Sequence, residues 1–219
     1  DRLQKDIVAF IFVPANHYGP RKELVSKIKD PNFDYTPNDP YLSHALHDEE
    51  FDLILNRIKK VGLKNTAADK VKVIFVPSYL QGNDGVINLS YYDVLPGLDL
   101  TVFPSYYEPW GYTPMESIAY YVPTITTSLS GYGNWLKKGK KASKCLSVIE
   151  RTDSNDSQVI SEIANIISEF TQKSESKREE SIKKTNEISL ASSWSNQLDT
   201  YYVAWENALN KVNERKHLI

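Results

Sequence analysis

Two glutamates separated by seven residues, Glu108 and Glu116, frame the part of the sequence whose residue types could do chemistry. Thr113 is predicted to be the N-cap of a helix, with Pro114 in the first turn and Glu116 three residues after the cap. The start of a helix offers unpaired amides and the positive end of the helix dipole, which together attract anions. We therefore predict that a diphosphate binds against the amides of residues 111–113, where Gly111 lets it approach the backbone closely.

The two carboxylates differ in how well folding alone explains them. Glu116 fits the glutamate of a capping box, and this structural role is its simpler explanation. Glu108 follows two tyrosines at the predicted end of a strand and precedes Pro109, where the fold requires no acid. Glu108 is therefore the stronger candidate for a side chain that acts on a substrate.

The elements that must position this stretch are predicted strands and helices that alternate along the chain. Apolar or β-branched runs predict strands at 6–13, 71–76, 98–103, 123–127 and 144–149. Helices are predicted at 49–61, at 90–96 and from Thr113 onward. This alternation predicts an α/β fold with a doubly wound parallel sheet, in which the 6–13 strand is buried on both faces. Ligands of such sheets bind at the carboxyl ends of the strands, and residue 103 is one of those ends.

The segments outside this alternation are an excursion and a helical tail. Residues 16–47 lack periodicity and are rich in proline, so we expect irregular structure with one short helix at 21–29. Residues 151–219 are predicted to form helices after a domain that covers 1–150. The last helix, from Trp194, carries an aromatic and aliphatic stripe, which core packing explains most simply. The alternative is a surface that docks on a domain missing from this chain.

Composition excludes several classes of function. The chain has 219 residues with 26 basic and 28 acidic side chains and no long basic run, which argues against a nucleic-acid binder. No apolar run approaches the roughly 18 to 20 residues of a membrane span. The single cysteine, Cys145, cannot form an internal disulfide, so we expect a cytoplasmic protein. His44 and His47 could share one helical face, but we expect no metal site.

Residues 103–114 read Phe-Pro-Ser-Tyr-Tyr-Glu-Pro-Trp-Gly-Tyr-Thr-Pro, and the Glu-x7-Glu pattern around them is typical of retaining glycosyltransferases. This block resembles the eukaryotic-type glycogen synthases, glycosyltransferase family three, which have the GT-B architecture. The segments at 6–11, 47–58 and 129–133 also resemble this family, whereas 16–43 and the tail beyond 150 resemble it poorly.

The resemblance implies the C-terminal, donor-binding Rossmann-like half of a glucosyltransferase. Such an enzyme transfers glucose from UDP-glucose to the 4-hydroxyl of an α-1,4-glucan with retention of configuration and without a metal cofactor. Glu108 and Glu116 are implied as catalytic residues, the first beside the donor glucose and the second against the ribose. Implied donor-binding residues are Tyr91, Trp110, Gly111, Tyr112 and Thr113. Whether Tyr91 or Tyr92 stacks on uracil, and whether Glu108 is a nucleophile or electrostatic support, stays open.

Departures from the family pattern qualify these expectations. No arginine or lysine that would grip the pyrophosphate matches the family before Asp6, and the acceptor-side domain is absent. The only methionine is Met115, so we expect a fragment that is inactive alone and that joins a missing N-terminal domain, with homo-oligomers left open. Residues 177–187 balance basic with acidic side chains, which predicts weak or absent regulation by glucose 6-phosphate. The alternatives are a GT-B enzyme that uses ADP-glucose or another sugar nucleotide, and a non-catalytic carbohydrate-binding module.

Overall fold

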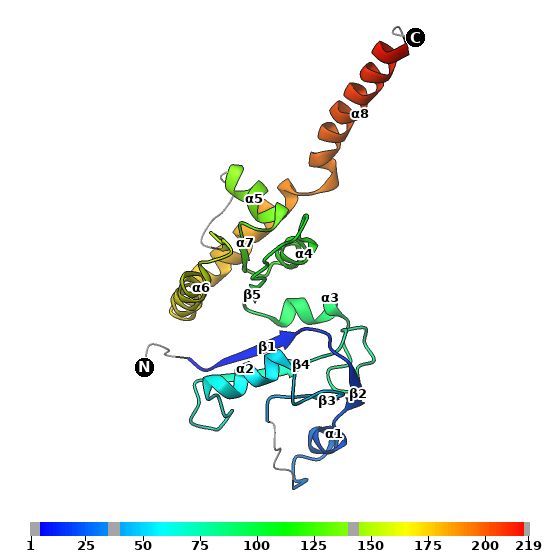
Figure 1. Cartoon of the computed structure of the whole chain (residues 1–219). Coiled ribbons are helices and arrows are strands. Elements are labelled where there is room, and N and C mark those ends of the chain that lie inside the picture. The colour runs from blue at the N-terminus through cyan, green and yellow to red at the C-terminus, as the bar shows by residue number, and fades with distance from the viewer. Residues whose placement is uncertain (1–4, 35–39, 140–144, 217–219) are drawn as a thin grey trace. The chain divides into compact units, whose positions relative to one another are not determined.

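The structure is a computed structural model that describes residues 5–34, 40–139 and 145–216 (Figure 1). The chain divides into two compact units, Asp1–Gly97 with Ser168–Gln172 and Leu98–Ile167 with Lys173–Ile219. These units do not coincide with the predicted domains 1–150 and 151–219, which are defined by function. The predicted boundary after residue 150 stays a prediction.

The first unit is built on two parallel strands. β1 (Ile7–Phe12) pairs with β4 (Val71–Val76) over its whole length, from Ile7 opposite Val71 to Phe12 opposite Val76. The core beside them consists of Tyr41, Leu42, Leu46, Leu55, Ile58, Val73 and Phe75. β1 was expected to be buried on both faces, but Val8 and Phe10 are 52% and 40% exposed, so that prediction is wrong. An apolar run shows that a strand can be buried, whereas the neighbours that cover it are set by the fold.

The excursion of the first unit is more regular than predicted. The predicted short helix is α1 (Lys22–Lys29), and it lies between two strands, β2 (His17–Pro20) and β3 (His44–Leu46), that pair antiparallel. Strands this short, one of them ending in proline, leave no alternating pattern in the sequence. His44 therefore lies in a strand, so the helical face that it could have shared with His47 is not formed. Its ring nitrogens lie 2.8 Å from Ser43 Oγ and 2.8 Å from the carbonyl oxygen of Asp84.

Side-chain caps mark the starts of α2 and α3 in the first unit. α2 (Leu53–Val61) starts four residues later than predicted because the Asp52 carboxylate accepts the Leu55 N–H at 2.7 Å. Ser90 and Asp93 form a complete capping box at α3 (Tyr91–Val94), which continues as a 3₁₀ turn, Leu95–Gly97. The predicted helix at 90–96 is therefore confirmed in position.

The second unit holds a three-stranded parallel sheet with the order β5 (Thr101–Val102), β6 (Thr124–Thr127), β7 (Leu146–Ile149). α4 (Tyr112–Ala119) connects β5 to β6, and α5 (Gly131–Lys138) follows β6. Buried hydroxyls join α4 to the sheet: Thr101 Oγ1 lies 2.6 Å from Ser117 Oγ and 2.9 Å from Thr124 Oγ1. The five predicted strands are thus present, each is parallel to its hydrogen-bonded neighbours, and the α/β class is confirmed. Their hydrogen bonds join them as a pair and a triplet.

Three helices follow β7 in the described part of the chain: α6 (Asp156–Thr171), α7 (Glu175–Ala191) and α8 (Trp194–Lys216) (Figure 1). The apolar face of α6 packs on the sheet of the second unit through Val159, Ile163 and Ile166. The stripe on α8 was expected to pack in a core, but Trp194, Tyr202 and Trp205 are more than half exposed. That prediction is wrong, because helical periodicity does not reveal which surface covers a stripe. None of the described helices is long and apolar enough to cross a membrane.

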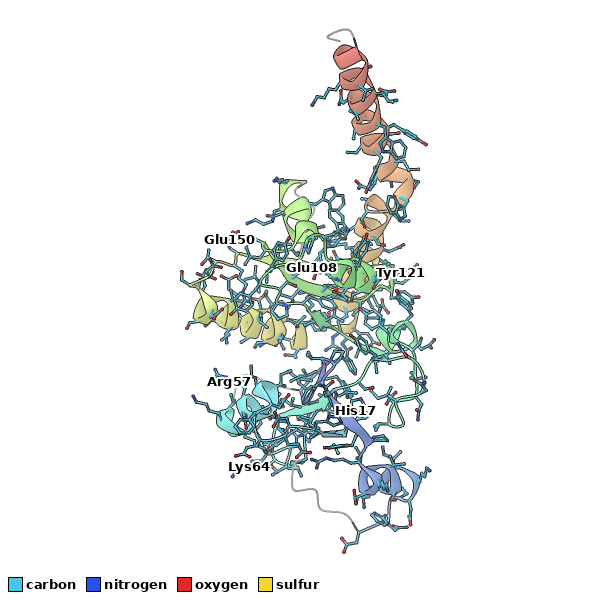
Figure 2. All side chains as sticks on the ribbon, turned by 45° about the vertical axis from the view of Figure 1, so that its right-hand side comes forward. His17, Arg57, Lys64, Glu108, Tyr121 and Glu150 are labelled. Atoms are coloured by element: carbon cyan, nitrogen blue, oxygen red, sulfur yellow. The ribbon has the colours of Figure 1, made fainter. Side chains whose placement is uncertain are left out.

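α4 ends in a turn that suits glycine but contains tyrosine (Figure 2). The Tyr121 N–H donates to the Ile118 carbonyl and the Val122 N–H to the Ser117 carbonyl, both at 3.0 Å. These two bonds define a Schellman motif, whose penultimate residue adopts a left-handed conformation. Tyr121 has φ of +67° there, a backbone conformation that is strained for a residue with a Cβ atom.

Replacing Tyr121 by glycine should therefore stabilise the protein, by up to about 1 kcal/mol in the free energy of unfolding. Urea titration followed by circular dichroism would measure the change. The neighbouring Tyr120→Gly is the matched control, because its φ of −89° carries no such strain and glycine there should lower stability. Equal destabilisation by both variants would contradict the assignment of strain to Tyr121.

Candidate functional site

Backbone hydrogen bonds hold the loop that carries Glu108, labelled in Figure 2, against the loop after β6 and the first residues of α5. The Glu108 N–H donates to the Leu129 carbonyl at 3.2 Å, and the Gly131 N–H donates to the Glu108 carbonyl at 3.0 Å. One step further, the Tyr132 N–H donates to the Trp110 carbonyl at 2.6 Å. Both backbone groups of Glu108 are thus paired, so its position is set by the second loop and not by α4 alone.

This close approach of two loops depends on Gly131. A Cβ atom at this position would overlap the carbonyl oxygen of Pro109 and stand 3.1 Å from Trp110 Cα. Any other residue would push the two backbones apart. The predicted loop at 129–133 is therefore a structural partner of the 103–114 block, and its glycine is what permits the contact.

Aromatic side chains anchor the same two loops to the core of the second unit. The Trp110 ring lies 5.6 Å from that of Tyr132 and 6.2 Å from that of Trp135, centroid to centroid. Tyr132 is completely buried, and burial raises the pKa of its hydroxyl to about 12, although its contact with Ser192 acts in the opposite direction. The Trp110 ring therefore packs the loop, and the donor-binding role implied for this residue stays a prediction.

The start of α4 differs by two residues from the prediction. The N-cap is Gly111, with φ of +100°, and Thr113 already lies inside the helix without a capping hydrogen bond. The capping box predicted for Thr113 and Glu116 is therefore not formed as predicted, because Thr113 is not the N-cap. Pro114 fits at the third helical position because the first amides of a helix have no intrahelical acceptor. The amides of residues 111–113 still precede the first bonded turn, as the phosphate hypothesis requires.

Gly111 also lies directly beside Glu108. A Cβ atom at Gly111 would stand 3.3 Å from Glu108 Cγ and 3.5 Å from Ser130 Cβ. Glu108 is partly buried, while Tyr107 and Tyr112 on either side are 80% and 58% exposed. The second unit thus brings Glu108 next to the helix start and leaves aromatic rings exposed around it.

Tyr91 belongs to the first unit, unlike the other predicted site residues. It is the first residue of α3, and its N–H donates to the Leu80 carbonyl at 2.9 Å. The ring of Tyr91 is partly buried and lies 5.3 Å from that of Tyr92, which is 46% exposed. The segment before α3 is ordered by Asp84. Burial would raise the pKa of this carboxylate, but the backbone N–H groups of residues 86–88 outweigh burial and lower it.

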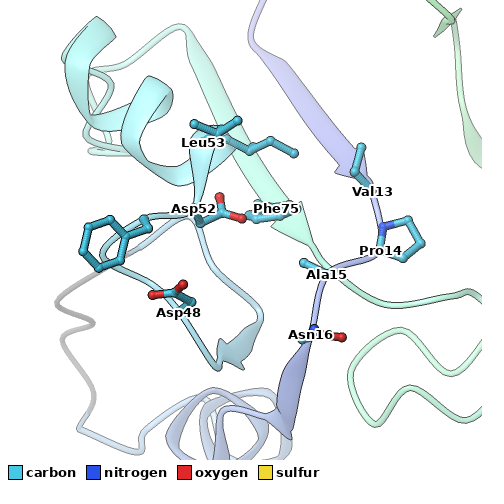
Figure 3. A pocket seen from close by; sticks show the side chains of 10 residues that line it. Val13, Pro14, Ala15, Asn16, Asp48, Asp52, Leu53 and Phe75 are labelled. Atoms are coloured by element: carbon cyan, nitrogen blue, oxygen red, sulfur yellow. The ribbon is translucent and has the colours of Figure 1, made fainter.

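A pocket opens at the carboxyl end of β1, where the rule for parallel sheets places ligands (Figure 3). Its volume is about 420 Å³, and Asp48 and Asp52 contribute its acidic groups. The Asp52 carboxylate already caps α2. Among the residues that the structure describes, no group of three or more histidine, cysteine, aspartate or glutamate side chains is arranged to hold a metal ion.

Sequence reasoning missed two residues that shape this site. Ser130 is fully buried and caps α5 by accepting the Gly133 N–H at 2.9 Å. Its position before a helix was a usable signal. Arg151 is 7% exposed and contacts the segment just before Glu108. No local pattern marks this arginine, because its partners lie about 45 residues away or across a helix start.

Comparison with known proteins identifies the family of this chain. A sequence model of the family described as glycogen synthase matches residues 32–218. Glycogen [starch] synthase isoform 2 of Saccharomyces cerevisiae is 33% identical over 176 residues, which cover 78% of this chain and 25% of that protein. The liver glycogen [starch] synthase of Homo sapiens is 41% identical over 99 residues, which cover 45% of this chain and 14% of that protein.

The chain is thus an α/β protein with parallel strands, and the range matched by the family model includes the loop of Glu108 at the start of α4. It belongs to the glycogen synthase family. The chain spans about a quarter or less of the length of the curated relatives it matches. A solved structure of WaaG, a glycosyltransferase involved in lipopolysaccharide biosynthesis, covers 91% of this chain and 46% of its own at 12% identity, with a TM-score of 0.44.

Gly131→Ala should destabilise the second unit, by about 1 to 3 kcal/mol, because the added methyl group forces the loops apart. Thermal unfolding followed by circular dichroism would measure the loss. Gly97→Ala is the matched control, since nothing lies within 4 Å of a Cβ atom there. A Gly131→Ala protein as stable as the control would show that the loops do not need this contact.

Proposed function

We propose that this chain is the donor-binding half of a retaining glucosyltransferase that transfers glucose from UDP-glucose to the non-reducing end of an α-1,4-glucan. The observation that carries the proposal is the loop of Glu108, locked by two backbone hydrogen bonds beside the start of α4 in a chain of the glycogen synthase family. The transfer requires the acceptor-side domain of a longer polypeptide, so the chain alone should not elongate a glucan.

Glu108 is the side chain proposed to face the donor glucose. As the bond to the leaving diphosphate loosens, positive charge develops at the anomeric carbon, and a nearby carboxylate favours it. A carboxylate serves this purpose only if it is held in place before the reaction. Pairing of both backbone groups of Glu108 supplies that rigidity.

The start of α4 is proposed to hold the diphosphate. The leaving UDP gains negative charge, and the amides of residues 111–113, at the positive end of the helix dipole, would stabilise it. Pro114 has no N–H to contribute, so the donors are Gly111, Tyr112 and Thr113. Glu116, one turn further along the helix, is proposed to accept a hydrogen bond from the ribose.

Tyr91 is proposed to stack on the uracil ring, in preference to Tyr92. The partial burial of Tyr91 and its place at a capped helix start support a fixed ring, while Tyr92 is more exposed. We further propose that no metal is needed, that the protein acts in the cytoplasm, and that glucose 6-phosphate regulates it weakly or not at all.

Glu108→Gln, in the full-length polypeptide, should lower the rate of glucosyl transfer from UDP-glucose at least about 100-fold while folding is retained. Incorporation of labelled glucose into glycogen would measure transfer, with ADP-glucose tested in parallel. Glu23→Gln, an exposed glutamate of α1, is the matched control and should leave the rate unchanged. Near-normal transfer by Glu108→Gln would overturn the proposed function.

Tyr91→Ala should weaken UDP binding roughly 5- to 140-fold, because stacking of a base on an aromatic ring contributes about 1 to 3 kcal/mol. Calorimetric titration of the same polypeptide with UDP would give the affinities. Tyr91→Phe should retain nearly all of the affinity, since the ring remains. A larger loss in Tyr92→Ala than in Tyr91→Ala would shift the stacking role to Tyr92.

A further inference from the structure

Arg151 is a buried arginine that lies two residues after the end of β7. Its side chain is 7% exposed, although arginine is rarely buried without partners. Its neighbour Glu150 does not pair with it, because the Glu150 carboxylate contacts Lys137 and accepts from Ser128 Oγ. The partners of Arg151 lie instead on the loop before Glu108 and at the start of α6.

Three groups surround the Arg151 guanidinium within the second unit. Nη1 donates to the Pro104 carbonyl at 2.7 Å, and Nη2 donates to Asp156 Oδ1 at 2.8 Å. The guanidinium carbon stands 3.5 Å from the centre of the Tyr106 ring. The Tyr106 hydroxyl in turn donates to the same Asp156 oxygen at 2.6 Å, which closes a ring of contacts. The hydrogen bond from the Tyr106 hydroxyl is the largest influence on the pKa of Asp156 and lowers it below its ordinary value, and Arg151 lowers it further.

The strength of this cluster does not rest on its ion pair. Asp156 is 55% exposed, so its attraction for Arg151 is largely screened by water. The hydrogen bond from a buried cation to the Pro104 carbonyl and the stacking on Tyr106 are less screened, and a planar guanidinium can make both at once. A lysine at this position could make only one of them.

The cluster holds the side of the loop that the backbone pairing does not reach. Glu108 and Trp110 are tied to residues 129–132, and the Ser105 carbonyl accepts the Thr127 hydroxyl at 2.7 Å. Arg151 ties Pro104 and Tyr106 to β7 and α6 on the other side. Without it, the Pro104 carbonyl loses its buried donor and the Tyr106 ring loses its stacking partner, while the bond from the Tyr106 hydroxyl to Asp156 remains on that side.

We propose that Arg151 is a positioning residue, which orders residues 104–106 and thereby sets the placement of Glu108 for glucosyl transfer. This inference rests on the proposed function for its kinetic consequence, whereas the ordering of the loop does not depend on it. A displacement of about 1 Å in a reacting group can lower a rate by about 100-fold. The expected effect is therefore on kcat more than on KM, because Arg151 touches no proposed donor contact.

The test compares Arg151→Ala, Arg151→Lys and the exposed Arg57→Ala as the matched control (Figure 2). In the full-length polypeptide, Arg151→Ala should lower kcat with UDP-glucose roughly 10- to 100-fold and change KM less than about threefold. Arg151→Lys should be intermediate, methylguanidinium should restore part of the kcat of Arg151→Ala, and Arg57→Ala should match the unsubstituted protein. Unchanged kcat in Arg151→Ala would overturn the inference.

A second measurement is independent of activity. Chymotrypsin should cleave after Tyr106 or Tyr107 at least several-fold faster in Arg151→Ala, with the other cleavage sites unaffected. Faster cleavage throughout the chain would mean a general structural role and would overturn the positioning role. If Arg151→Ala fails to fold, Tyr106→Leu removes the same stacking contact from an exposed residue and should give the same two changes in milder form. Absence of transfer by the unsubstituted protein would overturn the proposed function alone, because the cleavage test still decides whether Arg151 orders the loop.

Discussion

The second unit depends on one close contact, the pairing of the 108–110 backbone with the loop after β6. Two strands of a sheet have their backbone groups paired along the ladder, but a loop at the end of a strand must find partners elsewhere. Here the loop after β5 finds them in the loop after β6, and Gly131 lets the two approach. The contact converts a surface loop into a rigid support for a carboxylate, which a chemical role would require.

Buried polar and aromatic side chains stabilise this contact. Ser130 has no exposed surface and caps α5, and the rings of Trp110, Tyr132 and Trp135 pack against one another. The hydroxyls of Thr101, Ser117 and Thr124 satisfy one another between α4 and the sheet. Buried polar groups of this kind are costly unless paired, so they restrict the unit to one arrangement of sheet and helix.

Local sequence patterns correctly predicted the features that depend on residues close to one another in the sequence. The apolar run at 71–76 and the β-branched run at 123–127 are strands, and residues 151–219 contain the helices predicted for them, among them α6, whose apolar side chains recur at helical spacing. Errors arose where two local explanations competed. Thr113 and Glu116 fit a capping box, but the left-handed Gly111 begins α4 earlier. β2 and β3 are too short to leave an alternating pattern in the sequence. Their pairing also joins residues on either side of α1, so it is not a local feature.

The sequence by itself therefore determined the α/β class and the family, because residue type and spacing carry that information; the functional role of the 103–116 stretch stays a prediction. Only the tertiary structure decided that Glu108 is held by Leu129 and Gly131, that Arg151 reaches Pro104 and Tyr106, and that the stripe on α8 is exposed. These contacts join residues about 20 to 50 positions apart. Hydrogen bonds and close packing at that separation depend on how the chain returns to itself, which periodicity and capping patterns do not encode.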